Sequence, residues 1–413
     1  MAQARAKNLL SVGLAERLRQ TRERAGLSQL ELSRQAGLGK MTASDIEAGR
    51  RNQVNVGIGT VERLARVLNV PASFLAYGEE ATHALHIKDW MAPGFDPLKM
   101  VRELATQVNG SGGHIEQSYK YLDAMDADNW CAFTKQARYA SFIEGVPIKR
   151  AAEALGKECA GRALDVIGLG VGTGRHEARL VGDLIDAGYQ DLRLFLLDIS
   201  QPLLSVASKQ AAETLADHPS IPLCAIHGNF HQLPSYAHLF AGSSRRCRVF
   251  CMFGYTFGNL DNEIRFLRSS LTFSEPGDLL FLDVALAYAP AEDHAAVMKA
   301  DPALAQTLSG DFQRRQEEFN IGPIRRYTIG LQDIHFSRHL DTRSCVVPGS
   351  YALDMRATVK LKSGESKQFS VAYVKRYDAE KLARLLDEEG WELAHGWKYG
   401  EDYFMLCMLR RKR

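Results

Sequence analysis

The sequence lacks several features that would each point to a particular class of protein. No apolar run in its 413 residues approaches the roughly 18–20 residues needed to span a bilayer, and the polar start MAQARAKN differs from a secretory signal. The seven cysteines contain no C-x-x-C pair, and the twelve histidines form no H-E-x-x-H motif. We therefore expect a cytoplasmic protein without membrane contact, disulfide framework or metal site.

The net charge of the whole chain is only +2, but its basic and acidic residues are unevenly distributed. Residues 1–78 hold twelve basic and six acidic side chains, whereas the other 335 residues hold 39 basic and 43 acidic ones. This asymmetry predicts that a polyanion such as double-stranded DNA binds at the N-terminus. The length and the 46% hydrophobic content predict two or three folded domains.

The basic N-terminal part, residues 1–78, has the pattern of a bundle of short helices. Ser28 and Glu31 form a capping box at the start of a helix, and Gly37 permits a tight turn after it. We expect an all-α helix-turn-helix bundle with helices over 14–25, 28–36, 40–49 and 60–70 and a last one from 71.

The run GLSQLELSRQAGLGKMTASDIEAGRR resembles the phage-repressor (Cro/C1, or XRE) helix-turn-helix family over about residues 10–77. The resemblance implies a homodimer that binds DNA, with the third helix in the major groove. It implies that Gln29 lies at a phosphate, that Lys40, Thr42 and Ser44 face bases, and that Arg50 and Arg51 contact the backbone. Asp45 departs from the family pattern, and a module that only dimerises the protein is the alternative interpretation.

Two less regular segments follow the bundle. Residues 79–113 contain two prolines and end in Gly/Ser, which predicts a linker around one helix. Residues 114–160 are predicted to be helical, and their tyrosines and Trp130 either form a lid over a ligand or belong to a core.

From residue 161 onward, buried strands alternate with helices, which predicts an α/β, Rossmann-like domain over 161–286 with a parallel sheet. Its first strand, 163–169, leads into a G-x-G-x-G turn, and Asp198 ends the second. The dinucleotide and P-loop fingerprints both fail, so the pattern favours S-adenosylmethionine (SAM) over another nucleotide or a structural turn. The predicted cofactor-binding residues are Gly168, Gly170, Gly172, Thr173, Asp198, Asn229, Phe230, Phe253 and Gly254.

The loop FGYTFGNLD after the fourth strand lies at the carboxyl edge of the predicted sheet, where ligands bind in such folds. Asn259 in this loop is predicted to hold a carboxylate or an amine, with a helix cap as the alternative. Tyr255, Tyr119 and Tyr121 are candidates to accept the proton of an ammonium group.

GLGVGTGRHE, LLDIS, HGNF, the FGYTFGNLD loop and the C-terminal tail together resemble the histidine-specific Nα-methyltransferase family of ergothioneine synthesis, over about 115–413. The resemblance implies a class I methyltransferase fold with an α+β substrate domain inserted at 287–376, followed by the final helix and strands of the Rossmann-like domain at 377–413. It also implies that Asn259 binds the α-carboxylate of an amino acid.

Three departures from that family affect the predicted site. Gly168 stands where an acidic residue is expected, and Asn229 replaces an aspartate. Counted back from the tail lysine, Val371 and Tyr373 occupy the positions that read the imidazole, so both are predicted to contact a substrate other than histidine.

The sequence therefore predicts a SAM-dependent methyltransferase for a small amine-bearing acceptor, fused to a DNA-binding module. The alternative is a transcriptional regulator whose methyltransferase-like domain senses SAM or a metabolite without turnover. A nucleic-acid methyltransferase fits less well, because the second half is acidic and lacks an Asn/Asp-Pro-Pro-Tyr/Trp loop.

Overall fold

The computed structural model of the chain divides into two compact units, Met1–Ala84 and Leu85–Arg413, which we describe separately. The structure describes residues 14–50, 56, 58–68, 70, 75, 87–92, 94–189, 191–218, 221–240, 246–304 and 310–413. No described helix has the length and apolar character needed to cross a membrane.

The first unit is a small helical bundle. Its described helices are α2 (Leu14–Arg24), α3 (Gln29–Gln35), α4 (Thr42–Glu47) and α5 (Ile58–Val67). Both halves of the predicted capping box are present, since the Ser28 side chain accepts from the Glu31 N–H and the Glu31 carboxylate accepts from the Ser28 N–H. Leu18, Leu32 and Ile46 are fully buried between the helices. The helix predicted from residue 71 lies outside the described residues, apart from one helical position.

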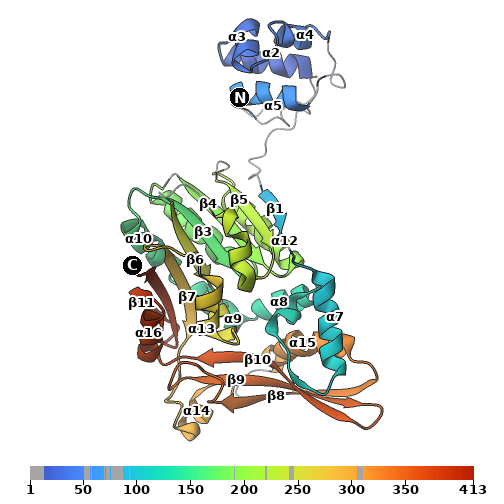
Figure 1. The fold of residues 1–413 in the computed structure, drawn as a ribbon, viewed down its shortest axis with the longest axis vertical. Coiled ribbons are helices and arrows are strands. Elements are labelled where there is room, and N and C mark those ends of the chain that lie inside the picture. The colour runs from blue at the N-terminus through green and yellow to red at the C-terminus, as the bar shows by residue number, and fades with distance from the viewer. Residues whose placement is uncertain are drawn as a thin grey trace. The chain divides into compact units, whose positions relative to one another are not determined.

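The second unit is built on an eight-stranded sheet with the order β1-β5-β4-β3-β6-β7-β12-β11 (Figure 1). The strands β1 to β7 in this sheet run parallel, β12 runs antiparallel to β7, and β11 runs antiparallel to β12. Their bounds are Ile87–Met91 (β1), Ala163–Leu169 (β3), Leu192–Asp198 (β4), Leu223–His227 (β5), Arg246–Met252 (β6), Leu279–Ala285 (β7), Trp391–Tyr399 (β11) and Phe404–Arg411 (β12).

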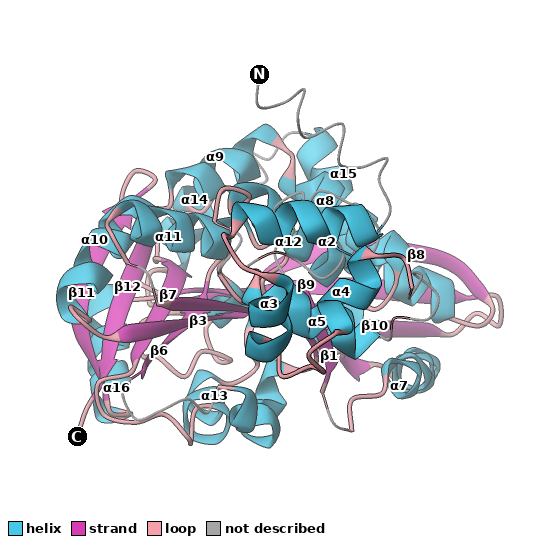
Figure 2. Ribbon diagram, turned by 90° about the horizontal axis from the view of Figure 1, so that it is seen from above, coloured by secondary structure: helices cyan, strands magenta, loops and turns pink. Residues whose placement is uncertain are grey.

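Helices cover both faces of this sheet (Figure 2). Because both faces are buried, the central strands are almost continuously apolar. One face packs against α10 (Ile148–Glu158), α11 (Arg175–Asp186) and α12 (Gln201–Thr214). The other packs against the 3-10 segment η2 (Phe230–Leu239), α13 (Glu263–Ser270) and α16 (Ala379–Glu388).

The insertion between β7 and α16 supplies β8, β9 and β10 of a second sheet, ordered β2-β10-β9-β8, and the short strand β2 joins it from the segment before β3. Its strands are β2 (Gly113–His114), β8 (Leu331–Asp341), β9 (Tyr351–Leu361) and β10 (Ser366–Arg376). One face packs on α7 (Pro97–Asn109) and α15 (Gly310–Tyr327), and α14 (His294–Ala300) lies at a smaller core beside it. The other described helices of this unit are η1 (Gln117–Tyr121), α8 (Ala124–Thr134), α9 (Ala137–Gly145) and η3 (Thr256–Asn259).

The segment predicted as a linker, 79–113, has a different role from the one expected. Its described part supplies β1, which pairs with β5 at the edge of the main sheet, and α7, which buries Leu104 and Val108 against the second sheet. Pro97 indicated a loop, but it is the first residue of α7, where a proline is tolerated. The predicted helix of this segment is confirmed by α7, whereas residues 87–91 form a strand of the main sheet where a linker was predicted.

Candidate active site

A cavity of about 290 Å³ lies between the carboxyl ends of the main sheet and the second sheet. The turns after β3, β4, β5 and β6 supply one part of its wall, and η1, α8, α15, β9 and β10 supply the other. Segments more than 250 residues apart in the sequence therefore meet at a single site. We call the first part the donor end and the second part the acceptor end.

The glycine-rich turn forms the floor of the donor end. Gly170, Gly172 and Gly174 have φ angles of 68°, 55° and 66°, a backbone region that disfavours side chains. A Cβ at Gly172 would lie 2.6 Å from the ring of Trp130, which belongs to α8. The glycine thus permits an aromatic side chain to pack directly on the turn, as the lid interpretation of Trp130 requires.

Asp198 connects the end of β4 to this turn. Its two carboxylate oxygens accept hydrogen bonds from the backbone N–H groups of Gly172 (2.9 Å) and Ser200 (2.8 Å). Burial raises the pKa of Asp198 to about 6, although those backbone donors oppose the shift. Each oxygen keeps a second lone pair, so the side chain lining the cavity can still accept from hydroxyl groups.

The other predicted cofactor residues divide into two groups. Gly170, Gly172, Thr173, Asn229, Phe230, Phe253 and Gly254 line the cavity together with Asp198. Asn229 also caps η2, since its Oδ1 accepts from the His231 N–H. Gly168 does not line the cavity, because it lies within β3 under the side chains of Val171 and Glu177. The prediction that Gly168 contacts the cofactor is therefore corrected.

Asn259 lies on the short helix η3 at the boundary between the two ends, and it lines the cavity. Its Oδ1 is buried and has no hydrogen-bond partner among the described residues. A buried amide oxygen without a partner is costly, so this atom suits a ligand that donates a hydrogen bond.

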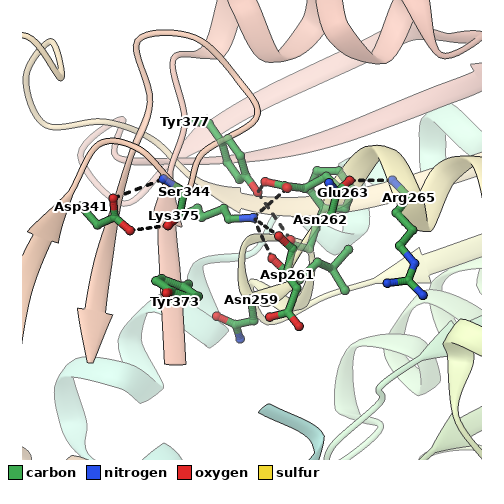
Figure 3. A network of polar contacts seen from close by, with 12 residues as sticks. Asn259, Asp261, Asn262, Glu263, Arg265, Asp341, Ser344, Tyr373, Lys375 and Tyr377 are labelled. Atoms are coloured by element: carbon green, nitrogen blue, oxygen red, sulfur yellow. Dashed lines mark hydrogen bonds and ion pairs between the residues drawn. The ribbon is translucent and has the colours of Figure 1, made fainter. Parts of the chain in front are cut away.

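A buried ionic network fixes the Asn259 loop to the second sheet (Figure 3). Lys375 of β10 donates to Leu260 O and to Glu263 Oε2, both at 2.7 Å, and Tyr377 donates to the other oxygen of Glu263. Lys375 and Glu263 are 1% and 0% exposed at their side chains. Removing one partner would leave an uncompensated buried charge, so this loop is held rigidly.

Three of the four predicted substrate residues face away from the cavity. Val371 is buried in the core of the second sheet, and Tyr373 stacks on His114 with 5.3 Å between ring centroids. Tyr119 is buried in the same core, where its hydroxyl donates to Glu103. The predictions for Val371, Tyr373 and Tyr119 are therefore wrong.

The alternation of side chains along β10 explains the first two errors. Ala372, Val374 and Arg376 line the cavity, whereas the residues between them point to the opposite face. Counting that is off by one residue exchanges the two faces. In η1 Tyr119 alone does not line the cavity, whereas Gln117, Ser118, Lys120 and Tyr121 do.

Lys120 lies at the acceptor end, although it was not predicted from the sequence to be a site residue. Its Nζ donates to Gln117 Oε1 (3.0 Å) and Asn320 Oδ1 (3.1 Å), and the described residues give it no ion pair. Burial lowers its pKa to about 7. Gln117 in turn donates to the backbone oxygen of Asn259 at 2.7 Å, so Lys120 and the Asn259 loop are connected through one side chain.

Aromatic side chains make up much of the remaining wall of the acceptor end. They come from α8, α9, α15 and β12, and they include Trp130, Phe133, Tyr139, Phe312, Phe319 and Phe404. Such a wall suits an apolar or aromatic body and also a cation over a ring face.

Tyr255 lines the cavity between these aromatic rings. It has a φ angle of 63°, which is uncommon for a tyrosine, and its ring stacks on Phe404. Burial raises the pKa of Tyr255 well above its ordinary value, and the nearby carboxyl of Asp283 adds to the shift. The phenol therefore stays protonated and is a poor base for an ammonium proton.

In the first unit, the predicted DNA-contacting residues differ in accessibility. Lys40 and Arg50 are exposed, Ser44 is half-buried, and Gln29 donates to Glu47 at 2.7 Å. Arg50 pairs with Asp45 at 3.3 Å. Thr42 is only 7% exposed, so the prediction that it faces bases is corrected. Arg51 lies outside the described residues.

Two family matches cover most of the chain. Residues 14–75 match a helix-turn-helix domain, and residues 113–411 match the family described as histidine-specific methyltransferase, SAM-dependent. No curated protein matches the chain.

Similar solved structures include the CcbJ methyltransferase from Streptomyces caelestis, at 18% identity over 65% of this chain and 97% of that one, with a TM-score of 0.33. The 1,6-didemethyltoxoflavin-N1-methyltransferase of Burkholderia thailandensis is 12% identical over 70% and 88%, with a TM-score of 0.37. A hypothetical transcription factor, NHTF from Neisseria, is 35% identical over 17% and 77%, with a TM-score of 0.15. The chain belongs to the histidine-specific, SAM-dependent methyltransferase family and carries a helix-turn-helix domain before its methyltransferase domain.

Proposed function

We propose that this enzyme methylates the amine of a small, amino-acid-like acceptor with an apolar or aromatic body, and that histidine is a poor substrate. The observation that carries this proposal is the composition of the cavity. A polar turn at one end adjoins an aromatic wall at the other, with the unpartnered Oδ1 of Asn259 between them.

At the donor end, we propose that Asp198 accepts from the ribose hydroxyls of SAM and that Asn229 and Phe230 border the adenine. Bound SAM supplies an electrophilic methyl group on its sulfonium. Thr173, Phe253 and Gly254 complete the wall around it, and Trp130 covers the glycine turn. These residues bind and orient the donor and keep water away from the methyl group.

At the acceptor end, the amide of Asn259 holds the amine or the α-carboxylate, and Lys120 provides a charge for that carboxylate. Support for the second role comes from the surroundings of Lys120, whose hydrogen-bond partners are two amide oxygens and no carboxylate among the described residues. The other two Lys or Arg side chains that line the cavity already have partners, since Arg376 pairs with Asp301 at 3.3 Å and Arg175 pairs with Glu144 at 3.6 Å. An acceptor with both an amine and a carboxylate would use both anchors.

The wall formed by β10 argues against histidine. Ala372 and Val374 line the cavity, and neither side chain can hydrogen-bond an imidazole nitrogen. A buried polar group without a partner costs about 1–3 kcal/mol. An apolar side chain or an aromatic ring without polar atoms would not have this cost in the same place.

Methylation of an amine requires no general base at the moment of transfer, because the nucleophile need only be presented deprotonated and in line with the methyl group. The raised pKa of Tyr255 agrees with a role in packing and positioning. Desolvation by the aromatic wall favours the neutral amine.

The experiment uses the full chain with methyl-labelled SAM and a panel of amino acids and aromatic amines, and binding of S-adenosylhomocysteine (SAH) is measured separately. We expect label transfer to at least one apolar or aromatic amino acid. Binding of SAH without transfer to any compound would contradict the proposal and favour a ligand sensor.

We further propose that the helix-turn-helix unit binds double-stranded DNA as a homodimer in the cytoplasm. Its exposed Lys40 and Arg50 and the basic charge of residues 1–78 support a DNA contact. Selection of genomic fragments by the purified protein at low salt tests this, and enrichment of no sequence would contradict it.

A further inference from the structure

The acid that the family pattern places on the first strand is missing, but the structure contains another carboxylate beside the same position. An ideal Cβ built on Gly168 would lie 2.8 Å from Cγ and 3.2 Å from Cδ of Glu177. Glu177 is the third residue of α11 and reaches back over β3. The absence of a side chain at Gly168 therefore provides the space that the Glu177 side chain occupies.

Glu177 is buried without an ionic partner. It is 2% exposed and lines the cavity at the donor end. Among the described residues, the hydrogen bond that favours its charged form comes from its own backbone N–H. The other carboxylates that line the cavity have partners: Asp198 accepts from two backbone N–H groups, and Asp301 pairs with Arg376. Glu116 accepts from the Ser118 hydroxyl, and Asp261 pairs with His114.

A carboxylate buried in this way requires a cation or a strong donor to offset its loss of hydration. The adenosine part of SAM offers only neutral donors, and Asp198 lies where the ribose is expected. The methionine part carries an α-ammonium, which has a positive charge and three donors.

We propose that Glu177 binds the α-ammonium of the methionine moiety of SAM and thereby takes over the place of the acid that Gly168 replaces. This inference rests on the proposed use of the donor end for SAM and assigns its methionine subsite. Glu177 thus brings a carboxylate from the helix α11 to the space beside Gly168 on the strand β3.

The surroundings of Glu177 predict that ligand binding changes its protonation, so the number of protons released on binding can be measured. Burial raises the pKa of Glu177 to about 8, and the charge of Asp198 adds to the shift. The other titratable neighbours stay neutral, because burial raises the pKa of the Cys251 thiol well above its ordinary value and lowers that of His176 to about 4. Below pH 8, binding of an ammonium to the ionised carboxylate must therefore release a proton.

The test uses calorimetry to compare the binding of two ligands, SAH and 5′-methylthioadenosine. Both contain the adenosine part, but only SAH contains the amino-acid part. In Glu177→Gln we expect the affinity for SAH to fall at least tenfold and the affinity for methylthioadenosine to stay within twofold. At pH 6.5, measurements in buffers of different ionisation enthalpy should detect a larger proton release on SAH binding in the wild type than in the variant, where only Asp198 can still release a fraction of a proton.

Asp183→Asn, on the same helix but outside the cavity lining, serves as the matched control and should change neither affinity. If Glu177→Gln does not fold, Glu177→Met places an apolar chain of similar length in the same site. Retained binding of methylthioadenosine demonstrates an intact fold.

Three results would overturn the inference. The first is an unchanged SAH affinity in Glu177→Gln. The second is an equal loss of affinity for SAH and for methylthioadenosine. The third is a loss of SAM affinity with SAH affinity intact, which would assign Glu177 to the sulfonium. Failure of the wild type to bind SAH would instead refute the proposed function itself.

Discussion

The two ends of the cavity are assembled in different ways. The donor end comes from consecutive strand–turn–helix units, so that Gly172 and Asp198 are close in sequence as well as in space. The acceptor end combines η1, α8, α15, β9 and β10, and Gln117 there donates to the backbone oxygen of Tyr373 at 3.0 Å. The donor end can therefore be recognised from local motifs, whereas the acceptor end depends on how distant segments pack.

The largest expected effect separates the two ends. Asn259→Ala should reduce methyl transfer roughly 10²–10³-fold, because a positioned donor or acceptor at the reacting group is lost. SAH affinity should change less than twofold, because the donor end remains intact. Single-turnover transfer and calorimetry measure these two quantities.

Asn262→Ala is the matched control, since Asn262 lies three residues away and caps α13 by accepting from the Arg265 N–H at 2.7 Å (Figure 3). It should cost about 1 kcal/mol of stability and leave transfer unchanged. An equal loss of transfer in both variants would mean that Asn259 acts through the fold of the loop.

Asp198→Ala tests the other end of the cavity. The loss of hydrogen bonds to a charged acceptor, worth roughly 1.5–3 kcal/mol each, should weaken SAH binding at least tenfold. Asp198→Asn keeps one acceptor oxygen and should retain part of the affinity. Unchanged SAH affinity in Asp198→Ala would remove this residue from the donor end.

The stability of the empty protein should reflect Glu177. Its folded-state pKa of about 8 lies above the ordinary 4.5, so the folded state binds the extra proton between these values and stability falls as pH rises through that window. Between pH 5 and pH 7 the loss of unfolding free energy from this group is about 2.5 kcal/mol. Measured by denaturant unfolding, the unfolding free energy of Glu177→Gln should fall less between pH 5 and pH 7 than that of the wild type, by that amount. The same pH dependence in both proteins would contradict the assigned pKa.

Lys120→Met examines the acceptor end alone. If Lys120 binds the acceptor carboxylate, the variant should raise KM about tenfold for an amino acid, a loss of roughly 1.4 kcal/mol. The KM for the corresponding amine without a carboxylate should be unchanged. An equal rise for both acceptors would assign Lys120 to packing.

The smallest effect lies outside the cavity. Arg50→Ala removes one exposed charge that contacts Asp45, so DNA affinity should fall a few-fold, evenly across sequences, and the salt slope should decrease by about one. Transfer and SAH affinity should not change. A change in sequence preference would mean that Arg50 contacts bases.

Much of the fold followed from local signals. The first strand spans the predicted residues 163–169, and Asp198 ends the second, because buried parallel strands are marked by apolar runs that stop at polar turns. The capping box at Ser28 was equally local. The helix-turn-helix domain and the methyltransferase domain were both recognised from motifs, and the family matches confirm them.

The remaining errors share a physical origin. The side of β10 that faces the cavity depends on its pairing with β9 and on the bulge between Ser370 and Ala372, so motif spacing alone selected Val371 and Tyr373 instead of Ala372 and Val374. Lys120 was missed because only its burial against residues 200 positions away makes it unusual. Thr42 fits the motif of a DNA-reading helix, but its side chain packs inward.

The measurement that tests the central claim most directly is kcat/KM for histidine against that for the best apolar or aromatic amino acid of the panel. Because Ala372 and Val374 cannot pair with an imidazole, we predict that histidine is at least tenfold less efficient. Efficient methylation of histidine, with apolar and aromatic amino acids unreactive, would contradict the account.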